Sequence, residues 1–386
     1  MNIAKEIHRR IYLSIRRKRA ALHEPVLDKN EIEILKKCIK SGFVSTAGKF
    51  IEKFEKKIIK LTKSKYAVAV VNGTAALEIA LKVSGVKFGD EVLVPSITFV
   101  GSANAISLAN AIPHFIDSDL NNLGICLESL EKHLKKISKI NSNNELINKY
   151  TGRKIKAVIP VHVYGNIINM DRLNRISKRY RLTVIEDAAE AIGSYYKSKH
   201  AGTFGTIGII SFNGNKLVTT GGGGVILTND KILAHKAKHL SANSKIAHPW
   251  NYYHDSVGWN YRMPNLNAAL GCSQIEKIKK IIFLKRKLAN IYYQNFINCK
   301  EFSIISESKN CQSNYWLNII SLTKGNTNLR NKILNYLVKK GYQCRPIWEP
   351  LHKLPMYKNC PRAKLVNVEK IKKKIIALPS SPKLVS

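Results

Sequence analysis

The sequence lacks the features of a membrane protein, a secreted protein and a zinc protein. None of its 386 residues lies in an apolar run of roughly 18 or more, and residues 1–20 contain no apolar block suited to a signal peptide. The cysteines are scattered singly, with no C-x-x-C pair, which argues against a disulfide framework or a zinc site. We therefore expect a cytoplasmic protein with reduced thiols and no bound metal.

Acidic residues are scarce as well. The 26 Asp and Glu residues are outnumbered by 64 Lys and Arg residues, which gives a formal net charge of +38. A basic surface gains affinity for nucleic acid through counterion release, but these cations are spread over the whole chain, with no nucleic-acid-binding motif and no basic stripe interleaved with aromatic residues. We attribute the charge to general composition and expect it to favour an anionic substrate.

The length predicts two domains, because a single core rarely grows beyond about 250–300 residues. Residues 1–21 form a basic N-terminal extension, in which Arg and Lys are interspersed with Ile7, Ile11 and Ile15. Such a segment could contact anionic lipid or a partner, but a solvated helix is the expected structure. A large domain is predicted over 22–247 and a small domain over 248–386.

Apolar periodicity in the large domain alternates between strand and helix spacing. Helical spacing occurs at 31–40, 50–61, 127–137 and 171–180, and strand-like runs occur at 66–71, 91–94, 112–116, 155–161, 182–185 and 206–212. The asparagine-rich stretch 138–153 is expected to be a surface insertion. This alternation predicts an α/β fold with a mostly parallel sheet, in which ligands bind at the carboxyl ends of the strands.

Lys216 is placed where a nucleophilic amine is expected. It lies between the apolar run 206–212 and four consecutive glycines, 221–224, which keep bulky side chains away and let backbone approach closely. A lysine in a tight, partly desolvated loop loses its proton more readily, and its amine can then attack an aldehyde. The alternative is a glycine-rich hairpin with an incidental lysine.

Two further strand ends carry polar residues. The run 66–71 leads into Asn72-Gly73-Thr74 at a helix start, where free N–H groups and the Thr74 hydroxyl could bind an anion or Asn72 could simply cap the helix. Asp187 follows the run 182–185. A phosphate cradle, a carboxylate at a strand end and a lysine in a glycine-rich loop are the three fixtures that pyridoxal 5′-phosphate requires.

From about residue 22 to 378 the sequence resembles the DegT/DnrJ/EryC1/StrS family of pyridoxal-phosphate-dependent nucleotide-sugar aminotransferases. The matching stretches, in the family's order, are "AVAVVNGTAAL", "GDEVLVPSITFV", "AVIPVHVYGN", "VIEDAAEAIGS", "ISFNGNKLVTTGGGG" and "GWNYRMPNLNAALG". Within the family it looks most like the branch that acts on UDP-linked 4-keto-6-deoxy-N-acetylhexosamines, from "LHEPVLDKNE", the glutamate of "EDAAE" and the asparagine of "SFNGNK". The resemblance implies the type I aminotransferase fold, with helices on both faces of the sheet and a smaller C-terminal α+β domain.

The resemblance also implies roles for single residues. Lys216 would be the Schiff-base lysine and proton shuttle, and Asp187 would pair with the pyridine nitrogen. Phe99 would stack on the ring. Glu190 stands where many members have a glutamine that bonds the ring oxygen, so its carboxyl group would have to be protonated or differently placed.

The phosphate group would be bound by two subunits. The residues implied are Gly73, Thr74, Ala75 and Ser211 of one subunit, with Asn260 or Arg262 in "GWNYRM" of the other. A homodimer with shared active sites is therefore expected. His162 and His352 are candidate substrate contacts, although a satisfied surface histidine is an equally good explanation of His352.

The implied reaction transfers an amino group from an amino acid, L-glutamate by resemblance, to the 4-keto group of a nucleotide-linked 6-deoxyhexose. The sugar would be UDP-linked and N-acetylated and destined for lipopolysaccharide or another surface polysaccharide. A dehydratase and a non-catalytic family member are the alternatives, and the retained Lys216 argues against both. Family members continue beyond "IIALPSSPKLVS" into a final helix, so the resemblance implies that one packing element of the small domain is missing.

Overall fold

The apolar runs of the first two thirds of the chain assemble into one seven-stranded sheet. In this computed structural model, which describes residues 3–386, the strand order is β1-β11-β10-β7-β6-β2-β3. The strands are β1 (Tyr66–Val70), β2 (Glu91–Pro95), β3 (Ile112–Ile116), β6 (Ile155–Val158), β7 (Thr183–Asp187), β10 (Ile207–Ser211) and β11 (Gly224–Thr228). β11 is antiparallel to both neighbours and all other pairs are parallel, so the predicted mostly parallel mixed sheet is confirmed.

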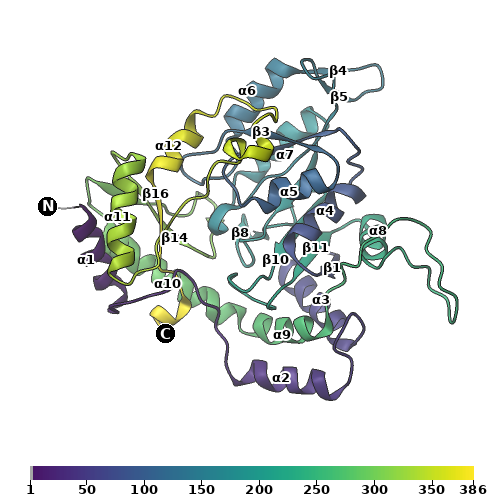
Figure 1. Cartoon of the computed structure of the whole chain (residues 1–386), viewed down its shortest axis with the longest axis horizontal. Coiled ribbons are helices and arrows are strands. Elements are labelled where there is room, and N and C mark those ends of the chain that lie inside the picture. The colour runs from purple at the N-terminus through teal and green to yellow at the C-terminus, as the bar shows by residue number, and fades with distance from the viewer. Residues whose placement is uncertain (1–2) are drawn as a thin grey trace.

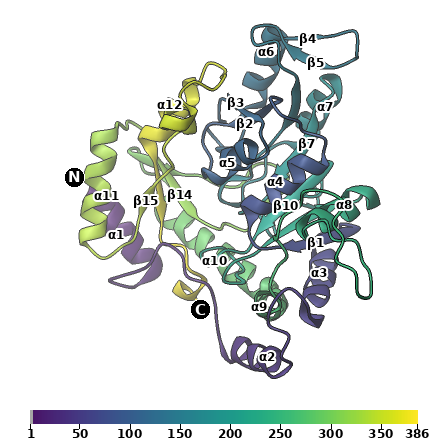
Figure 2. The ribbon, with the colours of Figure 1, turned by 45° about the vertical axis from the view of Figure 1, so that its right-hand side comes forward.

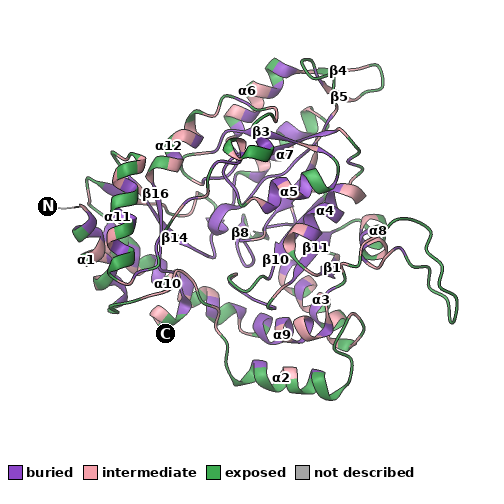
Figure 3. Cartoon of the chain, viewed as in Figure 1, coloured by how far each residue is buried: buried purple, intermediate pink, exposed green. Residues whose placement is uncertain are grey.

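Helices flank this sheet (Figures 1 and 2). They are α3 (Lys49–Thr62), α4 (Gly73–Val83), α5 (Gly101–Leu108), α6 (Leu127–Ile137), α7 (Met170–Arg179), α8 (Lys231–Ser241) and α9 (Asn265–Glu276). Buried residues concentrate in the strands and on the helix faces turned toward them (Figure 3). Because both faces of the sheet are covered, β2, β10 and β11 are buried along their whole length rather than at alternate residues.

The C-terminal third forms a second, smaller unit with its own apolar cluster. Its sheet has the order β12-β14-β16-β15, from β12 (Phe302–Ile304), β14 (Asn318–Leu322), β15 (Arg345–Pro346) and β16 (Ile375–Leu378). The helices α10 (Ile278–Phe296), α11 (Thr327–Lys339) and α12 (Val366–Lys374) accompany it. A smaller three-stranded sheet of β8 (Tyr195–Tyr196), β9 (Lys199–His200) and β13 (Cys311–Gln312) connects the two units. The domain boundary at 247/248 stays a prediction.

The N-terminal helix α1 (Ile3–Ile15) is not solvated, contrary to expectation. Ile7 and Ile11 are fully buried in the apolar cluster of the small unit, beside α10 and α11. The Arg10 guanidinium lies 5.6 Å from the centre of the Phe302 ring and bonds Glu6 at 2.6 Å. The isoleucines recur every four residues and so share one face, which the small unit covers. Residues 16–19, all basic, remain exposed.

A hairpin and a helix are among the segments that project from the body. The stretch 138–153 forms a hairpin of β4 (Ser138–Ile140) and β5 (Leu146–Asn148) at the surface, as expected of an insertion (Figure 1). Helix α2 (Lys29–Lys40) starts at a capping box of Asp28 and Glu31, but its apolar residues Ile32 and Ile39 are 56% and 60% exposed. Among residues 3–386, no helix combines the length and the apolar character needed to cross a bilayer.

Candidate active site

A cavity of about 350 Å³ lies at the carboxyl ends of β2, β7 and β10. It lies where a parallel sheet is expected to bind ligands. The predicted site residues that line it are Gly73, Thr74, Phe99, Asp187, Glu190, Ser211 and Lys216. The fold thus brings together residues from the start of α4, the loop before α5, the end of β7 and the loop after β10.

One part of the cavity is the start of α4. Asn72 caps the helix, because its Oδ1 accepts the Ala75 N–H at 2.8 Å. The Ala75 N–H is therefore occupied, and Ala75 does not line the cavity, so its contact with a phosphate group stays a prediction without support from this geometry. The N–H groups of Gly73 and Thr74 have no acceptor within residues 3–386. They remain free at the positive end of the helix dipole.

The absence of side chains at two glycines makes room beside these N–H groups. A Cβ atom on Gly73 would lie 2.9 Å from the Ser211 Cβ, and one on Gly101 would lie 2.9 Å from the Thr74 Oγ1. The hydroxyl groups of Thr74 and Ser211 therefore border the space in front of the helix. Two free N–H groups and two hydroxyl groups at a helix N-terminus fit a phosphate group.

Asp187 is held in place by donors. Its carboxylate is 5% exposed, and Oδ2 accepts the Ser102 hydroxyl at 2.6 Å while Oδ1 accepts the Ala189 N–H at 3.1 Å. The Ser102 hydroxyl lies 3.0 Å from that of Thr98. These bonds fix the carboxylate as a hydrogen-bond acceptor inside the cavity, which is the arrangement required to bind a protonated ring nitrogen.

Lys216 is enclosed by an acidic and an aromatic side chain. Its Nζ lies 3.2 Å from the Glu190 Oε1 and 4.2 Å from the centre of the Trp316 ring. The other Glu190 oxygen accepts the Tyr164 N–H at 2.8 Å. Burial raises the pKa of Glu190, and the Lys216 cation opposes that shift. Glu190 is thus placed as an ion-pair partner of the lysine.

The sequence did not reveal the walls that the small unit supplies. Trp316 and Trp348 line the cavity, and the Trp316 Nε1 donates to the Asn215 carbonyl at 3.0 Å. The sequence offers only a weak indication of these two residues. Tryptophan is rare in this chain, with four residues, and a rare large aromatic residue often forms a pocket wall. The sequence indicates Ser102 as a site residue more clearly, because Ser102 lies one helical turn after Thr98, just beyond the end of a strand.

Besides Ala75, four predicted residues lie outside the cavity. His162 is fully buried and its Nε2 bonds the Glu186 carboxylate at 3.0 Å, so it offers no surface to a substrate, contrary to expectation. His352, in η2 (Leu351–Lys353), bonds the Ser96 hydroxyl at 2.8 Å and ties the small unit to the end of β2. Asn260 and Arg262 are exposed, and the Tyr261 carbonyl between them accepts the Val71 N–H, just before the start of α4.

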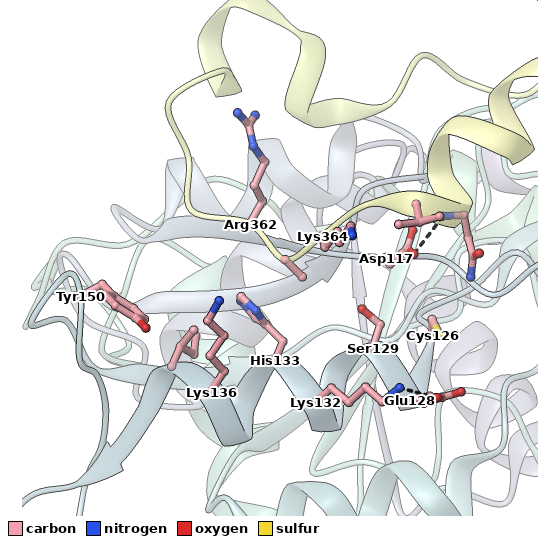
Figure 4. Close-up of a pocket in the computed structure, with 14 residues that line it drawn as sticks. Asp117, Cys126, Glu128, Ser129, Lys132, His133, Lys136, Tyr150, Arg362 and Lys364 are labelled. Carbon is pink, nitrogen blue, oxygen red and sulfur yellow. Dashed lines mark hydrogen bonds and ion pairs between the residues drawn. The ribbon is translucent and has the colours of Figure 1, made fainter.

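A larger cavity, of about 720 Å³, lies between α6 and the segment 362–367 (Figure 4). None of the predicted site residues lines it. Behind it a chain of bonds runs from His133 to His114 (2.8 Å) and from His114 to Glu91 (2.7 Å), and burial lowers the pKa of His133 to about 4. Figure 4 shows Arg362 pointing away from α6. These polar groups are satisfied by one another, so the smaller cavity is the candidate active site.

Comparison with known proteins agrees with this geometry. Residues 25–386 match the model of the DegT/DnrJ/EryC1/StrS aminotransferase family. GDP-perosamine synthase of Escherichia coli O157:H7 is 37% identical over 336 residues, which cover 87% of this chain and 86% of the relative. The putative pyridoxal phosphate-dependent aminotransferase EpsN of Bacillus subtilis is 33% identical over 351 residues, which cover 91% and 84%.

The fold also agrees with that of a solved aminotransferase structure. The solved structure of PseC from Helicobacter pylori, an aminotransferase involved in the biosynthesis of pseudoaminic acid, has a TM-score of 0.84 at 24% identity and covers 94% of this chain and 93% of that one. The predicted type I aminotransferase fold is thereby confirmed.

Proposed function

The chain belongs to the DegT/DnrJ/EryC1/StrS aminotransferase family, and we propose that it moves an amino group from L-glutamate to the 4-keto group of a nucleotide-linked 6-deoxyhexose. Sugar aminotransferase activity with pyridoxal phosphate is what the family and the relatives support. The observation that carries the proposal is that Lys216, Asp187 and the free start of α4 line one cavity. When bound there, the cofactor supplies an aldehyde and a ring that accepts electrons.

The residues present fit this cofactor. The Gly73 and Thr74 N–H groups, with the hydroxyls of Thr74 and Ser211, would hold the phosphate. The Asp187 carboxylate, held by Ser102, would hold the protonated ring nitrogen. Phe99 lines the cavity and is 56% exposed, so its ring face is free to stack.

Lys216 would carry the proton in both halves of the reaction. Its Nζ takes a proton from the α-carbon of the amino donor and later delivers one to C4 of the sugar. Glu190, 3.2 Å from Nζ, orients the ammonium form. Trp316 and Trp348 limit the entry of water, which would otherwise compete for the reacting groups.

The active unit is proposed to be a homodimer. Asn260 and Arg262 are exposed and do not line the cavity of their own chain, which leaves them free to serve a partner. The segment 246–257, which follows α8, projects from the body (Figure 1) and carries Trp250, Tyr252 and Val257 at 78%, 81% and 90% exposure. These apolar groups, and separately the exposed face of α2, are surfaces of the kind that association covers.

The sugar nucleotide is the finer part of the proposal. The motifs favour a UDP-linked, N-acetylated 4-keto-6-deoxyhexose made in the cytoplasm for a surface polysaccharide. The relatives from Escherichia coli and Vibrio cholerae are GDP-perosamine synthases, so the GDP-linked 4-keto-6-deoxyhexose is the specific alternative. Both nucleotide sugars are anions, which suits a chain with 64 basic and only 26 acidic residues.

A substrate panel tests the proposal. The protein, loaded with pyridoxal phosphate, is incubated with L-glutamate and either the UDP-linked N-acetylated or the GDP-linked keto sugar. We expect 2-oxoglutarate and a 4-amino sugar in equal amounts from the UDP sugar, and neither product from Lys216→Ala. Turnover of the GDP sugar alone would correct the nucleotide and leave the reaction standing. If neither sugar yields 2-oxoglutarate, the proposed reaction is wrong.

A further inference from the structure

One short segment of the small unit holds both partners of the Lys216–Glu190 ion pair. We call residues 313–316 the bridging segment. Its Asn314 Nδ2 donates to the carbonyl oxygens of Glu190 and Ile192, both at 2.9 Å. Its Trp316 Nε1 donates to the Asn215 carbonyl at 3.0 Å, one residue before the lysine. The main chain on each side of the ion pair is therefore fixed by the same four residues.

The bridging segment is in turn held by a buried amine. Lys285 of α10 is fully buried, and its Nζ donates to the Trp316 carbonyl at 2.7 Å and to the Ser380 carbonyl. Burial lowers the pKa of Lys285 well below its ordinary value. The two carbonyl oxygens accept two of the N–H groups of this amine.

This amine is an unfavourable choice for packing alone. Removing an amine from water costs free energy, and an apolar side chain of similar length would avoid that cost. His23 does not hold the indole through a hydrogen bond: it lies 6.3 Å from the Trp316 ring, centre to centre, and neither of its ring nitrogens has a partner within residues 3–386. Two polar side chains thus fix the main chain at Trp316: the Asn314 Oδ1 accepts its N–H at 2.9 Å, and the Lys285 Nζ donates to its carbonyl oxygen.

We propose that Lys285 is a positioning residue for the catalytic lysine and acts through Trp316. The bond from Lys285 fixes the carbonyl side of the Trp316 main chain, whose N–H is held by Asn314, and the indole then holds Asn215 and covers the Lys216 Nζ at 4.2 Å. An aromatic face at this distance stabilises an ammonium ion over the free amine. The position of the indole therefore sets how readily Lys216 releases a proton. The inference rests on the proposed role of Lys216.

Lys285→Met tests the inference, with Lys287→Met as the matched control. Both substitutions remove one amine from α10, but Lys287 is exposed and, among residues 3–386, bonds only the Val385 carbonyl. Three quantities are measured: cofactor content, the pH midpoint of the visible band of the bound cofactor, and kcat and KM for the amino donor. For Lys285→Met we expect retained cofactor, a shifted midpoint, and a kcat about 10- to 100-fold lower with KM changed less than about threefold. Lys287→Met should match the wild type.

Trp316→Phe is the second variant, and it decides the question if Lys285→Met does not fold. It keeps an aromatic face near Lys216 but loses the bond to Asn215, so we expect a smaller shift of the midpoint in the same direction. The inference is overturned if folded Lys285→Met has the midpoint and kcat of the wild type. If Lys285→Met does not fold, the same result for Trp316→Phe overturns it. Lys216→Ala distinguishes failure of this inference from failure of the proposed function. An active Lys216→Ala would contradict the proposed function, whereas an inactive one leaves that function standing and confines the failure to the role of Lys285.

Discussion

The Asp187 carboxylate has no basic partner within residues 3–386 and is held by a serine hydroxyl and a backbone N–H. Asp187→Asn keeps the shape but removes the negative charge that would keep a ring nitrogen protonated. We expect retained cofactor and a kcat lower by about 100-fold or more. Ser102→Ala leaves the Asp187 carboxylate charged and removes the 2.6 Å bond to it, together with the 3.0 Å contact to the Thr98 hydroxyl, so kcat should fall less. A near-normal kcat for Asp187→Asn, measured in steady state, would place the ring nitrogen elsewhere.

Glu190 gives the folded state a pH dependence of definite sign. Burial raises its pKa above the ordinary value of 4.5, so the folded protein still holds this proton at pH values where the unfolded chain has lost it. The resulting stabilisation is complete below pH 4.5 and is lost as the pH rises through the folded pKa. The free energy of unfolding of Glu190→Gln, which cannot titrate, should therefore fall less steeply over that range.

Urea denaturation at a series of pH values measures this slope. Glu33→Gln is the matched control, because Glu33 is exposed and should leave the wild-type slope unchanged. Equal slopes for the wild type and Glu190→Gln would show that the Glu190 carboxyl titrates alike in the folded and unfolded states.

Residues close to a strand end were predictable from the sequence, and residues brought in by the small unit were not. Lys216, Asp187 and Thr74 each follow an apolar run that becomes a strand, so their meeting follows from the parallel sheet. Trp316 and Lys285 depend on how the second unit packs on the first, and no local pattern encodes that packing. His162 also follows a strand, but its ring turns into the core toward Glu186.

At the scale of elements, periodicity located the helices but did not say what covers their apolar faces. The isoleucine faces of α1 and α2 are similar in sequence, yet that of α1 is buried and that of α2 is exposed. The difference arises because α1 meets the small unit, whereas α2 buries Glu31 and Cys38 against α9. A pattern predicts that a face is apolar, and only the assembled fold shows its partner.

The packing of α1 can be measured. Ile11 is fully buried in the apolar cluster of the small unit, so Ile11→Ala should lower the free energy of unfolding by about 2–4 kcal/mol. Lys5→Ala, at an exposed position of the same helix, should change it by less than about 0.5 kcal/mol. Equal stabilities of the two variants in urea would show that α1 does not contribute to the core in solution.

At the scale of the whole molecule, shared active sites predict complementation. A Lys216→Ala protomer keeps Asn260 and Arg262, and an Asn260→Ala/Arg262→Ala protomer keeps Lys216. A hybrid dimer of the two therefore has one complete site. Mixing the two inactive proteins in equal amounts under exchange should restore about a quarter of the wild-type activity, because half of the dimers are hybrids with one working site each. Shared sites would be ruled out if a mixture shown to contain hybrid dimers recovered no activity. A fully active monomer would rule them out as well.

Borohydride reduction of the cofactor-loaded protein, followed by peptide mass spectrometry, tests most directly whether Lys216 is the residue that holds pyridoxal phosphate. Reduction makes the bond between the cofactor and an amine permanent, so the modified peptide identifies the lysine among the many in this chain. We predict the added mass on the peptide that contains Lys216, and its loss in Lys216→Ala with the fold retained. Cofactor attached to a different lysine, or bound cofactor that reduction attaches nowhere, would contradict the proposed site.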